Sequence, residues 1–128
     1  MTCVWNSLLK SIHSEDFKIT MKNSRPSPEQ LVKFLKESNK PCTNIKHNGK
    51  YLTLREYKEN VEAINNFDIK SIYRGYNCSS SDPMLILVSH LFQIQIVHIF
   101  NGVRILYTPS PCFRYSISIQ SNSSHMWS

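Results

Sequence analysis

The sequence lacks closely spaced metal ligands and the marks of a disulfide-rich secreted protein. Its four cysteines are far apart and form no C-x-x-C pair, and its five histidines are dispersed as well. Structural zinc sites need closely spaced cysteines and histidines, so we expect no metal ion and no other cofactor. The chain shows no signal-peptide pattern and is not dense in cysteine, which favours free thiols in a reducing compartment over disulfides.

Long apolar runs and clustered charge are missing too. The stretch MLILVSHLF is shorter than a membrane span and is broken by polar residues, so we expect no membrane association. Lys and Arg outnumber Asp and Glu by 15 to 9, which gives a net charge of +6, but the basic residues are scattered along the chain. Nucleic-acid binders gather their positive charge on one face, so we do not expect nucleic acid as a partner.

The composition is that of a folded protein. Hydrophobic residues make up 41% of the chain and charged residues 19%, which suits a packed core. A length of 128 residues leaves little room for a second core, so we expect a single domain over residues 1–128. We further expect a monomer in the cytoplasm. Two origins of the chain stay open, a native start at Met1 or excision from a longer protein.

Apolar residues at helical spacing predict helices in the first part of the chain. The first covers residues 3–13. The second begins after Ser27 and the third after Thr53, and both starts carry the Ser/Thr-x-x-Gln/Glu pattern of a capping box. The polar stretch 13–28 is predicted to be a loop, and the stretch 65–76 is predicted to be extended.

A fourth helix is predicted from the segment DPMLILVSHLF. Ser81 or Asp82 is expected to cap its start, and Pro83 suits the first helical position. Apolar residues occupy nearly the whole circumference of this helix. We therefore expect it to be the buried central helix of the domain.

The last third of the chain predicts strands. The segments IQIVHIF and VRILY flank Asn101-Gly102, a pair that readily adopts the positive φ values of a tight hairpin turn. The segment FRYSISI alternates like a half-buried strand, and HMW is expected to form a last short strand. Helices followed by strands indicate an α+β fold, with a small antiparallel sheet packed between helices.

The two ends of the chain carry the residues of greatest chemical interest. Cys3 begins the first predicted helix, where unpaired backbone N–H groups and the helix dipole lower a thiol pKa from its free value of about 8.5. His125 begins the last predicted strand. A histidine beside a thiol can accept its proton and later donate one to a leaving amine. The residues alone leave open the alternative that Cys3 and His125 are unrelated in the fold.

The segment C-V-W-N-S-L-L-K-S-I resembles the nucleophile segment of the ovarian tumour (OTU) family of cysteine proteases. In that family the cysteine is followed by an apolar residue, an aromatic residue, a polar residue, a small residue and then an apolar helix face. DPMLILVSHLF with IQIVHIF resembles the family's buried helix and the strand after it, and FRYSISI with SSHMW resembles its last strands. The resemblance covers the start of the chain and the part from Asp82 onward, and leaves residues 15–75 unaligned.

This resemblance implies a papain-like OTU-type fold and a thiol peptidase activity. Such a deubiquitinase cleaves the bond after the C-terminal glycine of ubiquitin or a ubiquitin-like modifier. Cys3 would be the nucleophile, His125 the general base and acid, and the backbone N–H groups of Thr2 and Cys3 the oxyanion donors. A viral domain of this kind could also process its own polyprotein, and a viral or bacterial version would act in the host cytoplasm.

Two positions depart from the family's pattern. The family's D-G-N-C motif is incomplete, because Met1 and Thr2 stand where Gly and Asn would be and the Asp position precedes the chain. The Asp or Asn that often follows the histidine by two places is replaced by Trp127. The identity of the residue that orients the histidine therefore stays open. The candidates are Asn122, Asn6 and a residue upstream, and some members of the family work with a Cys–His dyad.

Several residues keep alternative interpretations. Trp127 is expected either to wall the channel for a diglycine tail or to serve packing alone. Trp5 is expected in the core, Cys42 and Cys112 are expected to have no catalytic role, and His98 is expected to be a core or edge histidine. The alternative function for the whole chain is an inactive OTU-fold module that binds ubiquitin or a viral partner without cleaving it.

Overall fold

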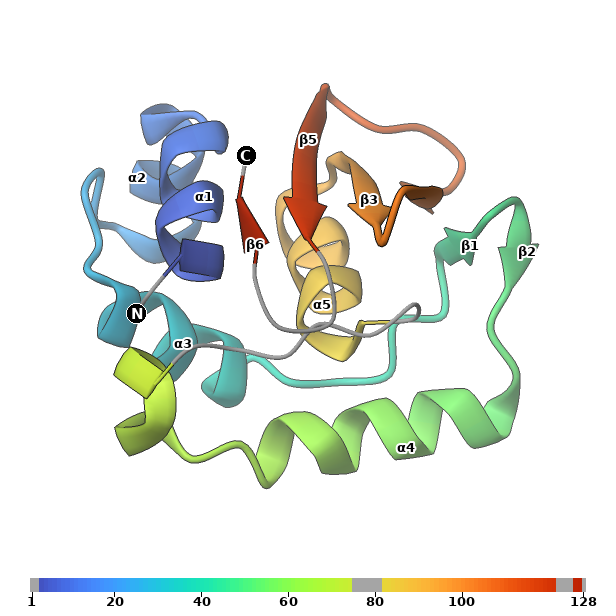
Figure 1. Ribbon diagram of the computed structural model, residues 1–128, viewed down its shortest axis with the longest axis horizontal. Coiled ribbons are helices and arrows are strands. Elements are labelled where there is room, and N and C mark those ends of the chain that lie inside the picture. Colours follow the sequence, from blue (N-terminus) through green and yellow to red (C-terminus); the bar gives the residue numbers. More distant parts are fainter. Residues whose placement is uncertain (1–2, 75–81, 122–125, 128) are drawn as a thin grey trace.

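A six-stranded sheet forms the framework on which the helices pack (Figure 1). The computed structural model describes residues 3–74, 82–121 and 126–127. Its elements, in chain order, are α1 (Cys3–Ser11), α2 (Ser14–Met21), α3 (Pro28–Glu37), β1 (Ile45–His47), β2 (Lys50–Tyr51), α4 (Leu54–Asn65), the 3₁₀ helix η1 (Ile69–Arg74), α5 (Pro83–Phe92), β3 (Gln95–Phe100), β4 (Val103–Pro109), β5 (Ser116–Ser121) and β6 (Met126–Trp127). The expected α+β class is confirmed.

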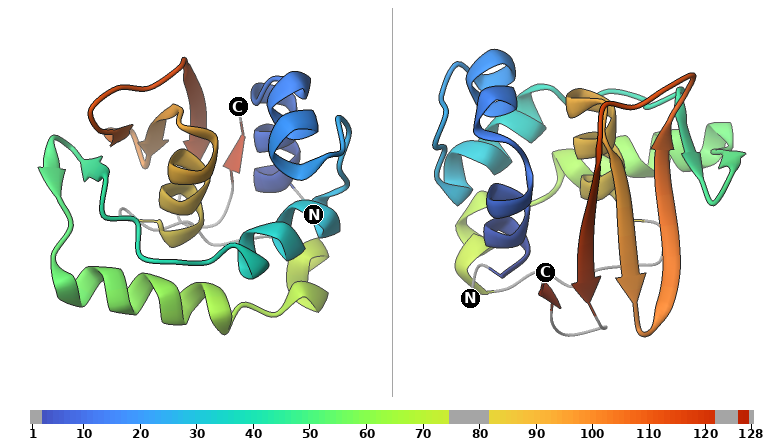
Figure 2. Two further views of the ribbon diagram at one scale, coloured as in Figure 1. Left: turned by 180° about the vertical axis from the view of Figure 1, so that it is seen from behind. Right: turned by 90° about the horizontal axis from the view of Figure 1, so that it is seen from above.

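Helix α5 is the central element, as predicted. It packs against helices α2, α3 and α4 and against strands β1, β3 and β4, and Figure 2 shows it covering one face of the sheet. Its start is fixed by Asp82, whose carboxylate accepts hydrogen bonds from the backbone N–H groups of Met84 and Leu85. Pro83 occupies the first helical position. The buried residues of the helix are Met84, Leu85, Ile86, Leu87, Val88, Ser89 and Phe92.

Both predicted capping boxes are present. The hydroxyl of Ser27 accepts a hydrogen bond from the N–H of Gln30, and the Gln30 side chain accepts one from the N–H of Ser27. Thr53 and Glu56 form the same reciprocal pair at the start of α4. These caps satisfy N–H groups that have no partner within the helix, which explains why α3 and α4 begin where the sequence predicts.

The prediction of a loop over 13–28 is wrong, because residues Ser14–Met21 form helix α2. This helix has a weak apolar stripe of its own and is held by distant parts of the chain. Phe17 is buried and packs edge-on against Phe92, with ring centroids 5.4 Å apart. Asp16 is also buried, and a buried carboxylate breaks the polar/apolar pattern from which helices are predicted.

The prediction of an extended segment over 65–76 is also corrected in its described part. Residues Ile69–Arg74 form η1, whose first turn is stabilised by Asp68. The Asp68 carboxylate accepts a hydrogen bond from the N–H of Lys70, and its carbonyl oxygen accepts one from the N–H of Ser71. Ile72 is fully buried and fixes this short helix to the core.

Two hairpins with Asn-Gly turns shape the sheet. Asn101 and Gly102 have φ values of 50° and 80° and connect β3 to β4, as predicted. Asn48 and Gly49 repeat this conformation, with φ values of 50° and 83°, between β1 and β2. The sequence predicts this second turn but not its strands, because β1 and β2 are too short to display an alternating pattern.

The expectation of an antiparallel sheet is wrong for one strand pair. The strand order is β2-β1-β4-β3-β5-β6, and β3 pairs with β5 in parallel. The cause is the short loop 110–115, which passes the start of β3: Arg114 donates to the carbonyl of Gln93, and Gln95 donates to that of Tyr115. Strand β5 therefore enters the sheet at the end where β4 leaves it. It runs opposite to β4 and hence in the same direction as β3.

None of the helices in the described part of the chain combines the length and the apolar composition that a membrane span requires.

Candidate active site

Helix α1 lies beside β6, the last strand of the sheet in chain order. Cys3 is the first residue of α1, and β6 both pairs antiparallel with β5 and packs against α1. Figure 1 shows β6 in the space between α1 and β5. His125 directly precedes β6 in the sequence. Helix α1, which contains Cys3, and strand β6, which follows His125, are therefore neighbours.

Most of the predicted site residues lie outside the described residues. Thr2, Asn122 and His125 fall in the segments that the structure does not describe, as do the side chains of Cys3 and Trp127. The contact between the thiol and the imidazole therefore stays a prediction. The structure describes the backbone of α1 and β6, and with it the placement of the elements on which the predicted site depends.

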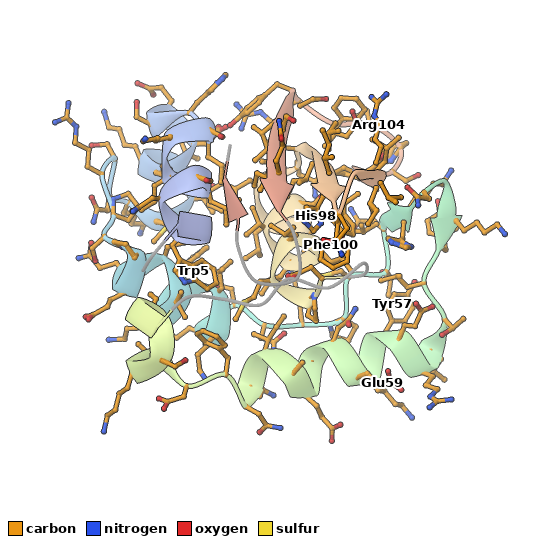
Figure 3. All side chains as sticks on the ribbon, viewed as in Figure 1. Trp5, Tyr57, Glu59, His98, Phe100 and Arg104 are labelled. Carbon is orange, nitrogen blue, oxygen red and sulfur yellow. The ribbon has the colours of Figure 1, made fainter. Side chains whose placement is uncertain are left out.

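Helix α1 is held by a stripe of buried side chains. Trp5, Leu8 and Ile12 follow one another at helical spacing and are at most 3% exposed. The ring of Trp5 packs edge-on against Phe67, with centroids 5.9 Å apart (Figure 3). The prediction that Trp5 is a core residue is confirmed. This stripe fixes the rotation of α1 about its axis, and it leaves Asn6 exposed.

The first turn of α1 is electrostatically suited to an anion. It contains no acidic residue. At the other end of the helix, Lys10 lies in the last turn, where its positive charge complements the negative pole of the helix dipole. The first backbone N–H groups of a helix have no partner within it. Both features suit an anion at the start of a helix, and the reactivity of the Cys3 thiol stays a prediction.

Cys42 and Cys112 differ sharply in their surroundings, and neither forms a disulfide. Cys42 is 6% exposed, and its sulfur lies 3.5 Å from the carbonyl oxygen of Lys40. Burial raises the pKa of the Cys42 thiol to about 11. A thiol with this pKa is protonated at neutral pH, so Cys42 is a poor nucleophile. Cys112 is exposed in the loop before β5.

Two histidines are shielded from water. His98 lies on the buried face of β3, with its ring centroid 6.2 Å from that of Tyr107 and 5.7 Å from that of Phe100 (Figure 3). Burial lowers the pKa of His98 to about 4, so its ring is neutral at neutral pH. His90 is half-buried, its Nδ1 lies 2.5 Å from Asn44 Oδ1, and burial lowers its pKa as well.

A polar cluster joins α2 to the start of β5, and the sequence does not predict it. The side chain of Asp16 is 1% exposed and accepts hydrogen bonds from the Tyr115 hydroxyl and the Arg114 guanidinium. The ring of His13 stacks on that of Tyr115, with centroids 3.8 Å apart, and the His13 N–H donates to the Tyr115 hydroxyl oxygen. Burial and the hydrogen bond to Asp16 raise the pKa of Tyr115 to about 12. These residues are far apart in the sequence, so no local pattern indicates their contact.

Neither a metal site nor a similar protein assigns the chemistry of this chain. Among the residues that the structure describes, no three His, Cys, Asp or Glu side chains are grouped so that they could hold a metal ion. No protein-family model, curated protein or solved structure matches the chain. The chemistry is therefore inferred from the residues of this chain and the placement of its elements.

Proposed function

We propose that this protein is a cysteine peptidase that cleaves the bond after the C-terminal glycine of ubiquitin or a ubiquitin-like modifier. The observation that carries the proposal is the packing of α1, which begins at Cys3, against β6, which follows His125. Nucleophilic thiol catalysis needs a thiol and an imidazole on adjoining elements. The resemblance of both chain ends to OTU proteases supports the same assignment.

In the proposed reaction, His125 accepts the proton of the Cys3 thiol, and the sulfur attacks the carbonyl carbon of the modifier's last glycine. The carbonyl oxygen becomes an oxyanion, which the backbone N–H groups of Thr2 and Cys3 stabilise. The C–N bond then breaks, and His125 donates its proton to the leaving amine. The modifier remains attached to Cys3 as a thioester.

Hydrolysis of this thioester completes the cycle. His125 accepts a proton from water, the resulting hydroxide attacks the thioester carbonyl, and the C–S bond breaks. The modifier leaves with a free carboxyl group, and the thiol proton is restored. In this scheme Asn6 or Asn122 orients the imidazole, and Trp127 lines the channel that holds the modifier's diglycine tail. Asn6 suits the first role because it is exposed and lies one turn after Cys3.

A ubiquitin derivative with a C-terminal electrophile tests this proposal directly. We expect it to form a covalent adduct with the parent protein, observed as a mass increase, and we expect no adduct with Cys3→Ala. Cys112→Ala is the matched control, because it removes an exposed thiol from the loop before β5. An adduct that persists in Cys3→Ala, or no adduct in any variant, would contradict the peptidase. Binding of ubiquitin without an adduct would identify the inactive module instead.

The role of His125 is tested by turnover of a ubiquitin conjugate with an amide-linked fluorophore. His125→Ala is expected to abolish turnover while the far-UV circular dichroism spectrum stays unchanged. His47→Ala removes a histidine from β1, on the β2 side of the sheet, and is expected to keep full turnover. Equal rates in the parent and in His125→Ala would remove His125 from the mechanism.

A further inference from the structure

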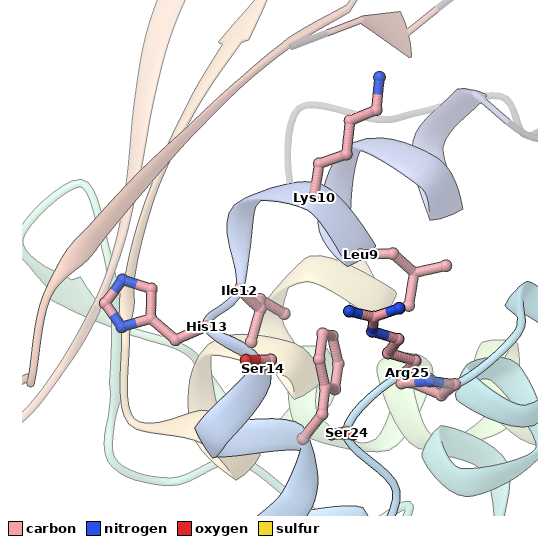
Figure 4. Close-up of a pocket in the computed structure, with 9 residues that line it drawn as sticks. Leu9, Lys10, Ile12, His13, Ser14, Ser24 and Arg25 are labelled. Atoms are coloured by element: carbon pink, nitrogen blue, oxygen red, sulfur yellow. The ribbon is translucent and has the colours of Figure 1, made fainter.

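A cavity at the junction of α1 and α2 combines an apolar floor with a polar rim. Its volume is about 410 Å³, and it is bounded by the end of α1, the start of α2 and the loop that leads to α3 (Figure 4). Ile12, Phe17 and Pro26 are buried in its floor, and Leu9 is half-buried. A cavity of this size and lining is typical of sites for small organic molecules.

The rim of this cavity carries charge of one sign only. Lys10 and Arg25 line it, together with His13, whose ring stacks on that of Tyr115, and the hydroxyl-bearing residues Ser14 and Ser24; none of its nine lining residues is acidic. Such a rim attracts anions and repels cations. The chain as a whole also carries an excess of positive charge, because Lys and Arg outnumber Asp and Glu by 15 to 9.

Arg25 is the best-placed of these charged groups. In Figure 4 its guanidinium lies over the apolar floor next to Leu9, whereas Lys10 extends outward. Its backbone N–H donates to the Asn23 side chain, and no ion pair joins its guanidinium to a carboxylate within residues 3–74, 82–121 and 126–127. A guanidinium presents paired N–H donors that match two oxygens of a phosphate group.

The start of α2 adjoins the same cavity. Its N-cap residue, His13, forms no side-chain capping hydrogen bond, so the first N–H groups of the helix are not capped in the usual way. The hydroxyl of Ser14, the first residue of α2, lies at the cavity as well. The Ser14 hydroxyl supplements the Arg25 guanidinium.

We propose that this cavity binds a phosphate monoester of a small apolar group. Arg25 holds the phosphate, and the apolar group covers Ile12 and Phe17. The site is independent of the proposed peptidase chemistry, because the cavity adjoins the last residues of α1 and Cys3 is the first residue of that helix. The two proposals can therefore be tested separately.

Phenyl phosphate is the probe for this site, and calorimetric titration of the full chain is the measurement. We expect it to bind at least about tenfold more tightly than inorganic phosphate, because the ring removes apolar surface from water. Arg25→Gln is expected to weaken binding of phenyl phosphate by about tenfold, since it removes charge-assisted hydrogen bonds. The exposed position of Arg25 means that this substitution leaves the core intact.

Arg104→Gln is the matched control. Arg104 is exposed on β4, away from α1 and α2, so the variant loses the same charge while the cavity is unchanged (Figure 3). We expect the parent affinity for phenyl phosphate in this variant. Equal affinity for phenyl phosphate and inorganic phosphate, equal losses in Arg25→Gln and Arg104→Gln, or no binding by the parent would each overturn the proposal.

Discussion

Single buried side chains in this protein are held in one protonation state by their surroundings. His98 is neutral because the core penalises its charged form, and Cys42 keeps its proton for the same reason. Both residues are chemically reactive types that the fold makes inert. The residue type alone does not reveal this, because the pKa depends on neighbours that are far away in the sequence.

Protonation of His98 is expected to destabilise the fold in acid. Its pKa is 6.5 in the unfolded chain and about 4 in the folded protein, so the unfolded state binds the proton first as the pH falls. The free energy of unfolding should therefore decrease between pH 6.5 and 4, by about 3 kcal/mol in total. Urea unfolding at a series of pH values measures this. His98→Leu should show a shallower decrease over the same range, and an identical slope would contradict the assignment.

The two described cysteines are expected to react at very different rates. Iodoacetamide at neutral pH should alkylate Cys112 readily, because this side chain is exposed. Cys42 should remain unmodified until the protein unfolds, since it is buried and its pKa is raised to about 11. Peptide mapping by mass spectrometry, with and without denaturant, distinguishes the two sites. Equal labelling in the folded protein would show that Cys42 is accessible.

At the level of single elements, the caps determine where each helix begins. Asp82 caps α5 from a buried position, whereas Thr53 caps α4 from an exposed one. An N–H group that loses its cap at the surface can bond to water. In the interior it cannot, so the same loss costs more free energy there.

Removing these two caps is therefore expected to have unequal effects. Thr53→Ala should lower the free energy of unfolding by about 1 kcal/mol. Asp82→Ala should lower it by about 2–3 kcal/mol, because the N–H groups of Met84 and Leu85 lose their acceptor inside the core. Urea denaturation of both variants gives the comparison. A loss of equal size in the two variants would show that burial of the Asp82 cap is unimportant.

The elements that the sequence predicts correctly are those with local signals. The caps at Ser27, Thr53 and Asp82 and the Asn101-Gly102 turn each consist of neighbouring residues with a specific backbone preference. Helix α2 has no such signal, because it is held by contacts such as that of Phe17 with Phe92. The direction of β5 likewise depends on a loop crossing the start of β3, which no short pattern encodes.

The candidate site also has some features with a local signal in the sequence and others without one. A cysteine at a helix start is visible in the sequence, and α1 does begin at Cys3. The resemblance of both chain ends to OTU proteases predicts that α1 adjoins the last strand, whereas spacing does not, because the two elements are far apart in the sequence. The cavity beside Arg25 has no signal in the sequence, since its lining comes from two helices and a loop that meet only in the folded chain.

At the scale of the whole molecule, contacts between distant segments hold the first helices to the sheet. Helix α1 packs against β5 and β6, and the cluster around Asp16 and Tyr115 joins α2 to the start of β5. Helices α1 and α2 are thus attached to strands that lie far along the sequence. Loss of one such attachment should destabilise the fold as a whole.

Tyr115→Phe is expected to lower the free energy of unfolding by about 2 kcal/mol, because the buried carboxylate of Asp16 loses a donor and the N–H of His13 loses an acceptor. A double-mutant cycle with Asp16→Asn should show that the two substitutions are not additive. Thermal unfolding of the four proteins supplies the data. Additive effects would mean that the hydroxyl and the carboxylate do not interact.

The same hydroxyl predicts behaviour in alkali. Tyr115 loses its proton at pH 10 in the unfolded chain and at about 12 in the folded protein, so the folded state retains the proton longer. The free energy of unfolding should therefore fall as the pH rises from 10 to 12. Urea unfolding over this range should show a steeper decrease in the parent than in Tyr115→Phe. Parallel curves would exclude the hydroxyl as the cause.

The pairing of the first helix with the final strand has a consequence for protein synthesis. A ribosome synthesises α1 well before β6, so the nascent helix has no β6 neighbour until Trp127 has been added. Termination before Met126 would leave the side of α1 that contacts β6 uncovered, although all the other described elements had been made. Contacts between α1 and β6 therefore form only after all the other described elements have been synthesised.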